Sequence, residues 1–234
     1  MRMTMALGIG LAVLSAACLE RVETPIGVAA ANNDAAEIRV LLRTGVKADD
    51  IGPNGVTPLM IAARRGALDA MNALFEAGAD PNRRDRRFDW TPLMHAVHKG
   101  QAEAAEALLE RGADPNLGTE GGLTPLMMAA ADPDPRVVGL LLAHGANPRT
   151  VGEYGDTPLA RAVSGGALSD IDRPILGGCH PETVRALLKH DPALRLPANL
   201  QGRAALMWSR LRGCSDVASL VTIDTRPAAA RRRE

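Results

Sequence analysis

The sequence predicts an all-α solenoid, in which about six helix-turn-helix units, caps included, are joined by extended finger loops. The first observation is a Thr-Pro step that recurs at residues 24, 57, 91, 124 and 157 of the 234-residue chain. A fixed period near 33 residues is typical of repeat arrays. The second observation is the composition, which is 46% apolar but only 2% aromatic. Few aromatics and many alanines favour thin stacked layers over one thick core.

Residues 91–123 illustrate the anatomy of one unit. Thr91 can cap a helix with its hydroxyl, and Pro92 fits the first helical turn. A short helix, "LMHAVHK", then ends at Gly100, and "QAEAAEALLERG" forms a second helix with apolar residues on one side. Gly112 can adopt the left-handed conformation that ends this helix. The stretch "ADPNLGTEGGL" reads as an extended finger with a tight turn.

Such units cannot bury their own apolar faces, so each must stack on its neighbours. We expect the repeat domain to span residues 24–223, followed by a disordered tail at 224–234. The predicted units are 24–56, 57–90, 91–123, 124–156, 157–203 and a cap at 204–223. The fifth unit carries an insertion, "LSDIDRPILGGCH", and has Asp191 in place of the usual terminating Gly. In the cap, Ser209, Arg210, Arg212 and Asp216 suit a solvent-facing end.

The repeated phrases resemble the ankyrin repeat family, whose units read Gly-x-Thr-Pro-Leu-His-x-Ala-Ala and later Gly-Ala-Asp-x-Asn. Here they appear as "GVTPLMIAARRG…ALFEAGADPN", "WTPLMHAVHKG…ALLERGADPN" and "GLTPLMMAA…LLLAHGANP". The resemblance implies a binding module without enzymatic activity or cofactor, which contacts a protein partner through its concave face. The family's His after Leu is replaced by Met60, Met94, Met127 and Ala160.

The first residues resemble a bacterial export signal. One Arg precedes an apolar run from Met5 to Ala17, which is shorter than the roughly 20 residues of a membrane-spanning helix. Residues 1–17 are therefore expected to be a signal peptide, and the protein to be periplasmic. Two readings stay open after cleavage: Cys18 follows a relaxed lipobox, "SAAC", and becomes a lipidated membrane anchor, or it merely follows the cleavage site. The alternative to export is a cytoplasmic regulatory protein whose apolar N-terminus caps the domain.

The two remaining cysteines, Cys179 and Cys214, lie near corresponding helix-helix turns of the last two units. An oxidising periplasm would permit a disulfide between them. Cys179 also precedes His180, which leaves a thiol enzyme as a remote alternative, although no third group is evident to orient the pair. His95 and His98 are three residues apart, but His95 occupies a position that is apolar in other units, so packing is favoured over a metal site.

The non-repeating positions predict the binding surface. By resemblance, the concave face consists of finger tips and of the exposed ends of the first helices. The candidate partner-binding residues are Arg64, Arg65, Arg86, Arg87, Phe88, Trp90, His98, Lys99, Tyr154 and Asp156. Three of the five aromatics fall in this set, and aromatic and Arg side chains often dominate interface energies. The alternative is that Phe88 and Trp90 merely pack the finger against its neighbour.

Charge along the array is uneven although the net charge is zero. Basic residues gather in the second and third units, around "RRDRR", and acidic residues gather later, so the face could orient a bipolar partner. The alternative is ordinary solvated charge, in which Asp85 and Asp89 offset the arginines. The zero net charge gives no support to a nucleic-acid partner. We expect a monomer without a metal site.

Overall fold

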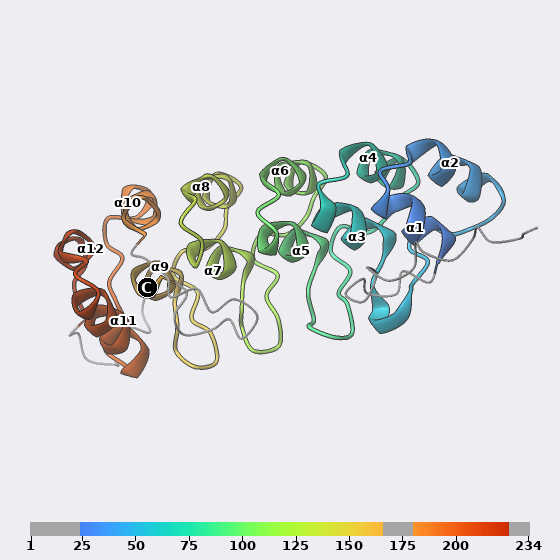
Figure 1. Cartoon of the computed structure of the whole chain (residues 1–234). Helices are drawn as coiled ribbons and strands as arrows, with labels where there is room; N and C mark the ends of the chain where they lie inside the picture. Colours follow the sequence, from blue (N-terminus) through green and yellow to red (C-terminus); the bar gives the residue numbers. More distant parts are fainter. Residues whose placement is uncertain (1–23, 166–179, 225–234) are drawn as a thin grey trace, which may run out of the picture.

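The computed structural model describes residues 24–165 and 180–224, which form a row of helix pairs in two layers (Figure 1). Odd-numbered helices make one layer, even-numbered helices make the other, and the finger loops extend from the odd-numbered layer. The helices are α1 (Pro25–Ala31), α2 (Ala35–Arg43), α3 (Pro58–Arg65), α4 (Leu68–Glu76), α5 (Pro92–His98), α6 (Ala102–Glu110), α7 (Pro125–Ala130), α8 (Pro135–Ala143), α9 (Pro158–Ser164), α10 (Pro181–His190), α11 (Leu200–Leu211) and α12 (Ser215–Leu220), with a 3₁₀ turn η1 (Pro53–Gly55).

The all-α solenoid is confirmed, and its helices begin where the Thr-Pro steps predict. Thr91 Oγ1 accepts a hydrogen bond from the Met94 backbone amide at 3.3 Å, and Pro92 occupies the first turn of α5. The same cap opens α1, α3, α7 and α9. Gly112, after α6, has φ +88°, the left-handed conformation that lets the chain leave the helix.

In the second unit, Met60 stands in place of the family's histidine and contributes both packing and a weak polar contact. Met60 is fully buried, and its sulfur lies 3.3 Å from the backbone nitrogen of Thr57, from which it accepts a hydrogen bond. The thioether is a weak acceptor, yet it satisfies the amide that precedes the helix. In the fifth unit Ala160 stands at this position and has no such acceptor.

The core is a continuous seam of small and aliphatic side chains along the stack. Leu59, Leu93, Leu126 and Leu159 occupy one repeated position and are at most 1% exposed. A second repeated position holds Ala62, Ala96, Ala129 and Ala162, all at most 2% exposed. Since each layer packs on its neighbours, burial is shared along the whole array and stability is the sum of adjacent contacts.

A polar side chain after each second helix ties its unit to the next one. The Asn116 side chain accepts from the Asn147 amide at 2.8 Å and donates to the Gly145 carbonyl at 3.0 Å. Asn82 makes the equivalent pair of bonds one unit earlier. We call these contacts the unit clamps, and they satisfy backbone groups that would otherwise have no partner in the loop.

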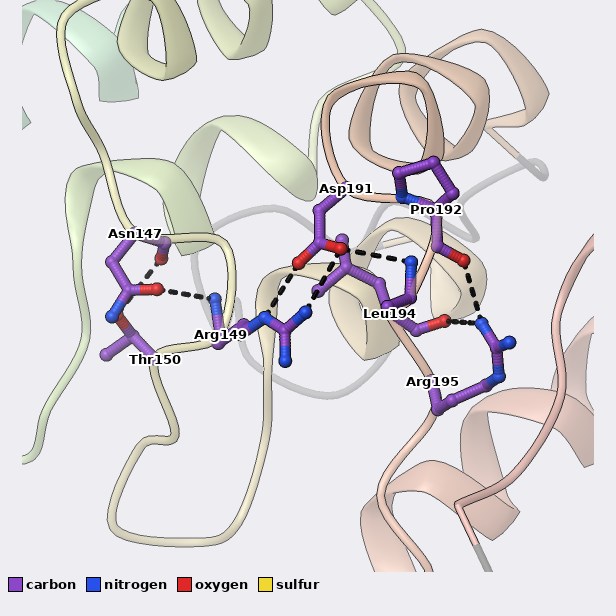
Figure 2. Close-up of polar contacts among 8 residues, drawn as sticks. Asn147, Arg149, Thr150, Asp191, Pro192, Leu194 and Arg195 are labelled. Atoms are coloured by element: carbon purple, nitrogen blue, oxygen red, sulfur yellow. Dashed lines mark hydrogen bonds and ion pairs between the residues drawn. The ribbon is translucent and has the colours of Figure 1, made fainter. Parts of the chain in front are cut away.

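At the junction of the fourth and fifth units, an ion pair replaces the asparagine clamp (Figure 2). Arg149 occupies the position of Asn116, and its Nε and Nη2 donate to the Asp191 carboxylate at 2.7 and 3.1 Å. Asp191 also accepts from the Ala193 amide at 3.0 Å. The hydrogen bonds from Arg149 lower the pKa of Asp191. The Asp that the sequence places where other units have Gly therefore serves as the partner of Arg149.

The last unit is less polar on its outside than expected. Ser209 is 1% exposed and its hydroxyl donates to the Leu206 carbonyl, so its assignment as a solvent-facing residue was wrong. Arg210 and Asp216 are exposed, as predicted. Exposed apolar side chains of α11 are Leu200 at 80%, Met207 at 50%, Trp208 at 38% and Leu211 at 69%.

Several sequence predictions lie outside the described residues. They are the signal peptide at 1–17, the lipidation of Cys18, Cys179 with its insertion, and residues 225–234 of the predicted tail. Residue 224 is described, and its amide donates to the Leu196 carbonyl at 2.8 Å. Within the described ranges no helix is both long enough and apolar enough to span a membrane.

Candidate protein-binding surface

The finger of the second unit, residues 83–90, is shaped by the carboxylate of Asp85. Asp85 Oδ1 accepts hydrogen bonds from the backbone amides of Arg87 at 2.8 Å and Phe88 at 2.7 Å. The Asp85 amide donates to the Trp90 carbonyl at 2.9 Å and so closes the loop. Asp89 adopts φ +59°, a left-handed conformation that Asp tolerates better than most residues. These bonds fix the directions of Phe88 and Trp90.

The same carboxylate joins the finger to helix α5. Asp85 Oδ2 lies 2.9 Å from His95 Nε2, and the two side chains are 1% and 7% exposed. Burial alone would raise the pKa of Asp85, but hydrogen bonds from His95 and from the Phe88 and Arg87 amides outweigh it, so the pKa is lowered. Asp85 is therefore ionised at neutral pH. His95 is buried, as its repeat position predicts, and its polar role is to hold the finger.

An aromatic cluster packs against this pair through His95. The Trp90 ring is edge-on to His95, with centroids 5.5 Å apart, and tilted against His98 at 4.9 Å. Phe88 lies 5.1 Å from Trp90, and the Arg87 guanidinium is 4.7 Å from the centre of the Phe88 ring. Trp90 is half-buried, while Phe88 is 41% exposed. Packing and exposure, which the sequence posed as alternatives, are both present in this cluster.

Basic side chains surround the cluster. Arg65 ends α3, and Lys99 follows α5 at the equivalent position of the next unit; both are exposed. Arg86 and Arg87 are exposed on the finger, whereas Arg64 and His98 are half-buried. We define the basic-aromatic surface as Arg64, Arg65, Arg86, Arg87, Phe88, Trp90, His98 and Lys99. It draws on the second and third units only.

Neighbouring fingers hold this surface in place. The Arg86 amide donates to the Asn54 carbonyl of η1 at 2.6 Å. On the other side, Asp89 Oδ2 accepts from the Glu120 amide at 2.9 Å and pairs with Arg84. Side chains on a scaffold tied on both sides lose less conformational freedom when a partner binds.

The two remaining candidate residues, at the end of the fourth unit, are placed differently. Tyr154 is 76% exposed on the finger of the fourth unit, outside the two units that form the basic-aromatic surface. The Asp156 side chain is 16% exposed and bound to Arg161 Nε at 2.6 Å. Its charge is thus compensated by Arg161, and we leave Asp156 out of the proposed surface.

Sequence reasoning missed two parts of this face. It counted Asp85 as an outward charge, although His95 at an otherwise apolar position was a signal for a buried partner. It also missed Trp208 and Leu211 on α11, because the last unit lacks Thr-Pro. Gly213 allows the last unit to be aligned with the second one, because it corresponds to Gly66. Leu211 and Arg212 then correspond to Arg64 and Arg65.

The remaining reactive side chains form no centre within the described residues. No group of three or more His, Cys, Asp or Glu side chains could hold a metal ion there. His180 is 3% exposed, and its Nδ1 has no hydrogen-bond partner among the described residues. Burial lowers the pKa of His180 despite its hydrogen bond to the Ala130 backbone, which makes the side chain neutral at pH 7.

The disulfide is described at one end only. Cys214 is disulfide-bonded, and the two other cysteines of the sequence, Cys18 and Cys179, lie outside the described residues. Pairing with Cys179 therefore stays a prediction, as does a reactive thiol at that position.

The stacked helix pairs with their fingers define a repeat solenoid. Comparison with known families agrees: a model described as ankyrin repeats, in three copies, matches residues 11–85 and 93–172, about two thirds of the chain. The chain belongs to the ankyrin repeat family, whose repeats are generally protein-protein interaction modules without enzymatic activity. No curated protein matches the chain.

Proposed function

We propose that this protein is a non-enzymatic binding module of the bacterial envelope that holds a protein partner on its concave face of fingers and first helices. The observation that carries the proposal is that Phe88 is exposed next to Trp90. Both lie on a finger that is held by hydrogen bonds to Asp85 and to the two adjacent fingers. Rigid aromatic groups beside arginines are the usual energetic centres of protein interfaces.

The envelope location is supported by the apolar N-terminal run and the small residues before Cys18. Lipidation of Cys18 would hold the first unit near the membrane, since only five residues lie between Cys18 and Thr24. One observation favours the second candidate, a cytoplasmic ankyrin protein: the family match extends back to residue 11, inside the segment proposed as a signal peptide. Mass spectrometry of the native protein separates the two, because an intact Met1 refutes export and a diacyl-modified Cys18 supports anchoring.

Partner capture from an envelope extract tests the binding surface. Wild type is compared with Phe88→Ala, Trp90→Ala and Arg86→Glu/Arg87→Glu. Arg43→Glu is the matched control, because Arg43 is exposed on α2 in the even-numbered layer. We expect the variants on the basic-aromatic surface to lose proteins that wild type and the control retain, while circular dichroism shows that all are folded. Equal recovery by all variants would refute the assignment of this face.

A further inference from the structure

We infer that the segment bound by the basic-aromatic surface is a short acidic stretch of a protein, with an aromatic or aliphatic side chain seated on Phe88 and Trp90. The inference rests on the proposed function and names the chemistry of the partner. Carboxylates would meet the exposed guanidinium groups of Arg65 and Arg86. Arg forms paired hydrogen bonds with carboxylates in a fixed geometry, which adds specificity to charge attraction.

The fold gives other partners to the two carboxylates that lie among the finger arginines in the sequence. Residues 83–90 hold four Arg and two Asp. Asp85 has its side chain 1% exposed and directs its charge to His95 and two backbone amides. Asp89 is bound to Arg84 and to the Glu120 amide. Both carboxylates are therefore occupied within the fold, and neither is the partner of Arg65 or Arg86.

The extent of the basic area favours a short segment over a long polyanion or a membrane. Arg65 and Lys99 hold equivalent positions in adjacent units, and Asp132 holds that position in the fourth unit. The next two finger tips carry the exposed acids Glu120 and Glu153. A nucleic acid or an anionic bilayer extending along the fingers would meet these acids and be repelled. An acidic stretch confined to two adjacent units, about 8–10 Å apart, would not reach these acids.

The polar residues in the centre of the surface also favour a mixed ligand. The Phe88 ring is covered on one side by the Arg87 guanidinium, and Trp90 is covered by His98. These contacts leave the exposed part of each ring for an apolar group, with charge at its margin. A ligand with carboxylates alone would leave the aromatic area uncovered, and one with apolar groups alone would give Arg65 and Arg86 no anionic partner.

The test uses synthetic peptides and Trp90 as the reporter. The protein carries Trp208→Phe, so that Trp90 is its single indole. A twelve-residue peptide of alternating Glu and Leu with one central Phe is compared with the same peptide containing Gln instead of Glu. We expect the Glu peptide to shift Trp90 emission and bind at least about 10-fold more tightly than the Gln peptide at low salt. Raising the salt concentration should weaken the binding of the Glu peptide only.

Protein variants test the named cations. Arg65→Glu/Arg86→Glu should lower the affinity for the Glu peptide about 10-fold or more and leave the affinity for the Gln peptide unchanged. Arg43→Glu should change neither affinity. Equal affinity for the two peptides, or no binding of the Glu peptide up to about 1 mM, would overturn the inference. So would stronger binding of oligodeoxythymidylate, or of vesicles with anionic lipid, than of the Glu peptide.

The outcomes separate this inference from the proposed function. If Trp90→Ala abolishes capture of an envelope protein but Arg65→Glu/Arg86→Glu does not, the binding role stands and the acidic chemistry is wrong. If no variant on this surface changes capture, the proposed function itself fails.

Discussion

Removing the Asp85 carboxylate should destabilise the protein more than a substitution in a surface loop usually does. In Asp85→Ala, the Arg87 and Phe88 amides lose an acceptor but lie on an accessible loop, where water can replace it. His95 Nε2 is different, because its side chain is only 7% exposed and it loses its partner at 2.9 Å. Hydrogen bonds to a charged group contribute about 1.5–3 kcal/mol, and a buried orphan costs about 1–3 kcal/mol. We expect a loss of about 3 kcal/mol in the free energy of unfolding.

Urea denaturation followed by circular dichroism measures this loss, and Trp90 emission reports on the finger in the same samples. A second variant isolates the cause. His95→Leu places an apolar residue where the second and fourth units have Ile61 and Met128. In the Asp85→Ala background it removes the buried orphan, so the double variant should be about 1–2 kcal/mol more stable than Asp85→Ala.

Two results would refute this reasoning. One is a loss below about 1 kcal/mol for Asp85→Ala, within the range of ordinary surface substitutions. The other is strict additivity, in which His95→Leu costs as much without the carboxylate as with it. Either would mean that the contact between the finger and α5 has little energetic weight.

Three further predictions concern other parts of the array. Because burial lowers the pKa of His180, the unfolded chain binds a proton at this side chain more readily than the folded chain, and stability should fall as the pH drops through about 6.5. His180→Gln should flatten a plot of melting temperature between pH 7.5 and 5.5, and an unchanged slope would contradict this. Asp191→Ala should cost about 1 kcal/mol or less in urea denaturation, because Arg149 is 46% exposed, and the effect should shrink at high salt. Asn116→Ala removes two clamp bonds and should cost about 1–2 kcal/mol with no salt dependence; a larger loss at Asp191 than at Asn116 would contradict this ranking.

The architecture could be predicted because each repeated residue has one structural role. A Thr before Pro caps a helix, a Gly after it ends one, and Leu and Ala at fixed spacings pack on the neighbouring unit. These roles depend on local geometry and on the next unit alone, so the sequence of a single unit contains nearly all the information needed.

The polar organisation of the fingers could be predicted less well, because it depends on contacts between a finger and the helix that follows it. His95 and Arg161 occupy the same helix position, and each binds a finger carboxylate, Asp85 in one unit and Asp156 in the other. Where this position is Ile61 or Met128, no such bond is needed. A charge count cannot distinguish an acid held in this way from an acid facing solvent, and the rule emerges only when the units are aligned.

The unit clamps have a consequence for how this protein can change over generations. Because Asn82 and Asn116 make the same two bonds across successive junctions, a whole unit could be duplicated or deleted there, and the flanking units would meet through the same joint. The segment between Asn82 and Asn116 carries six of the eight residues of the basic-aromatic surface and lies between these two junctions. Recombination at such joints could move, copy or remove a binding patch without requiring any other layer to repack.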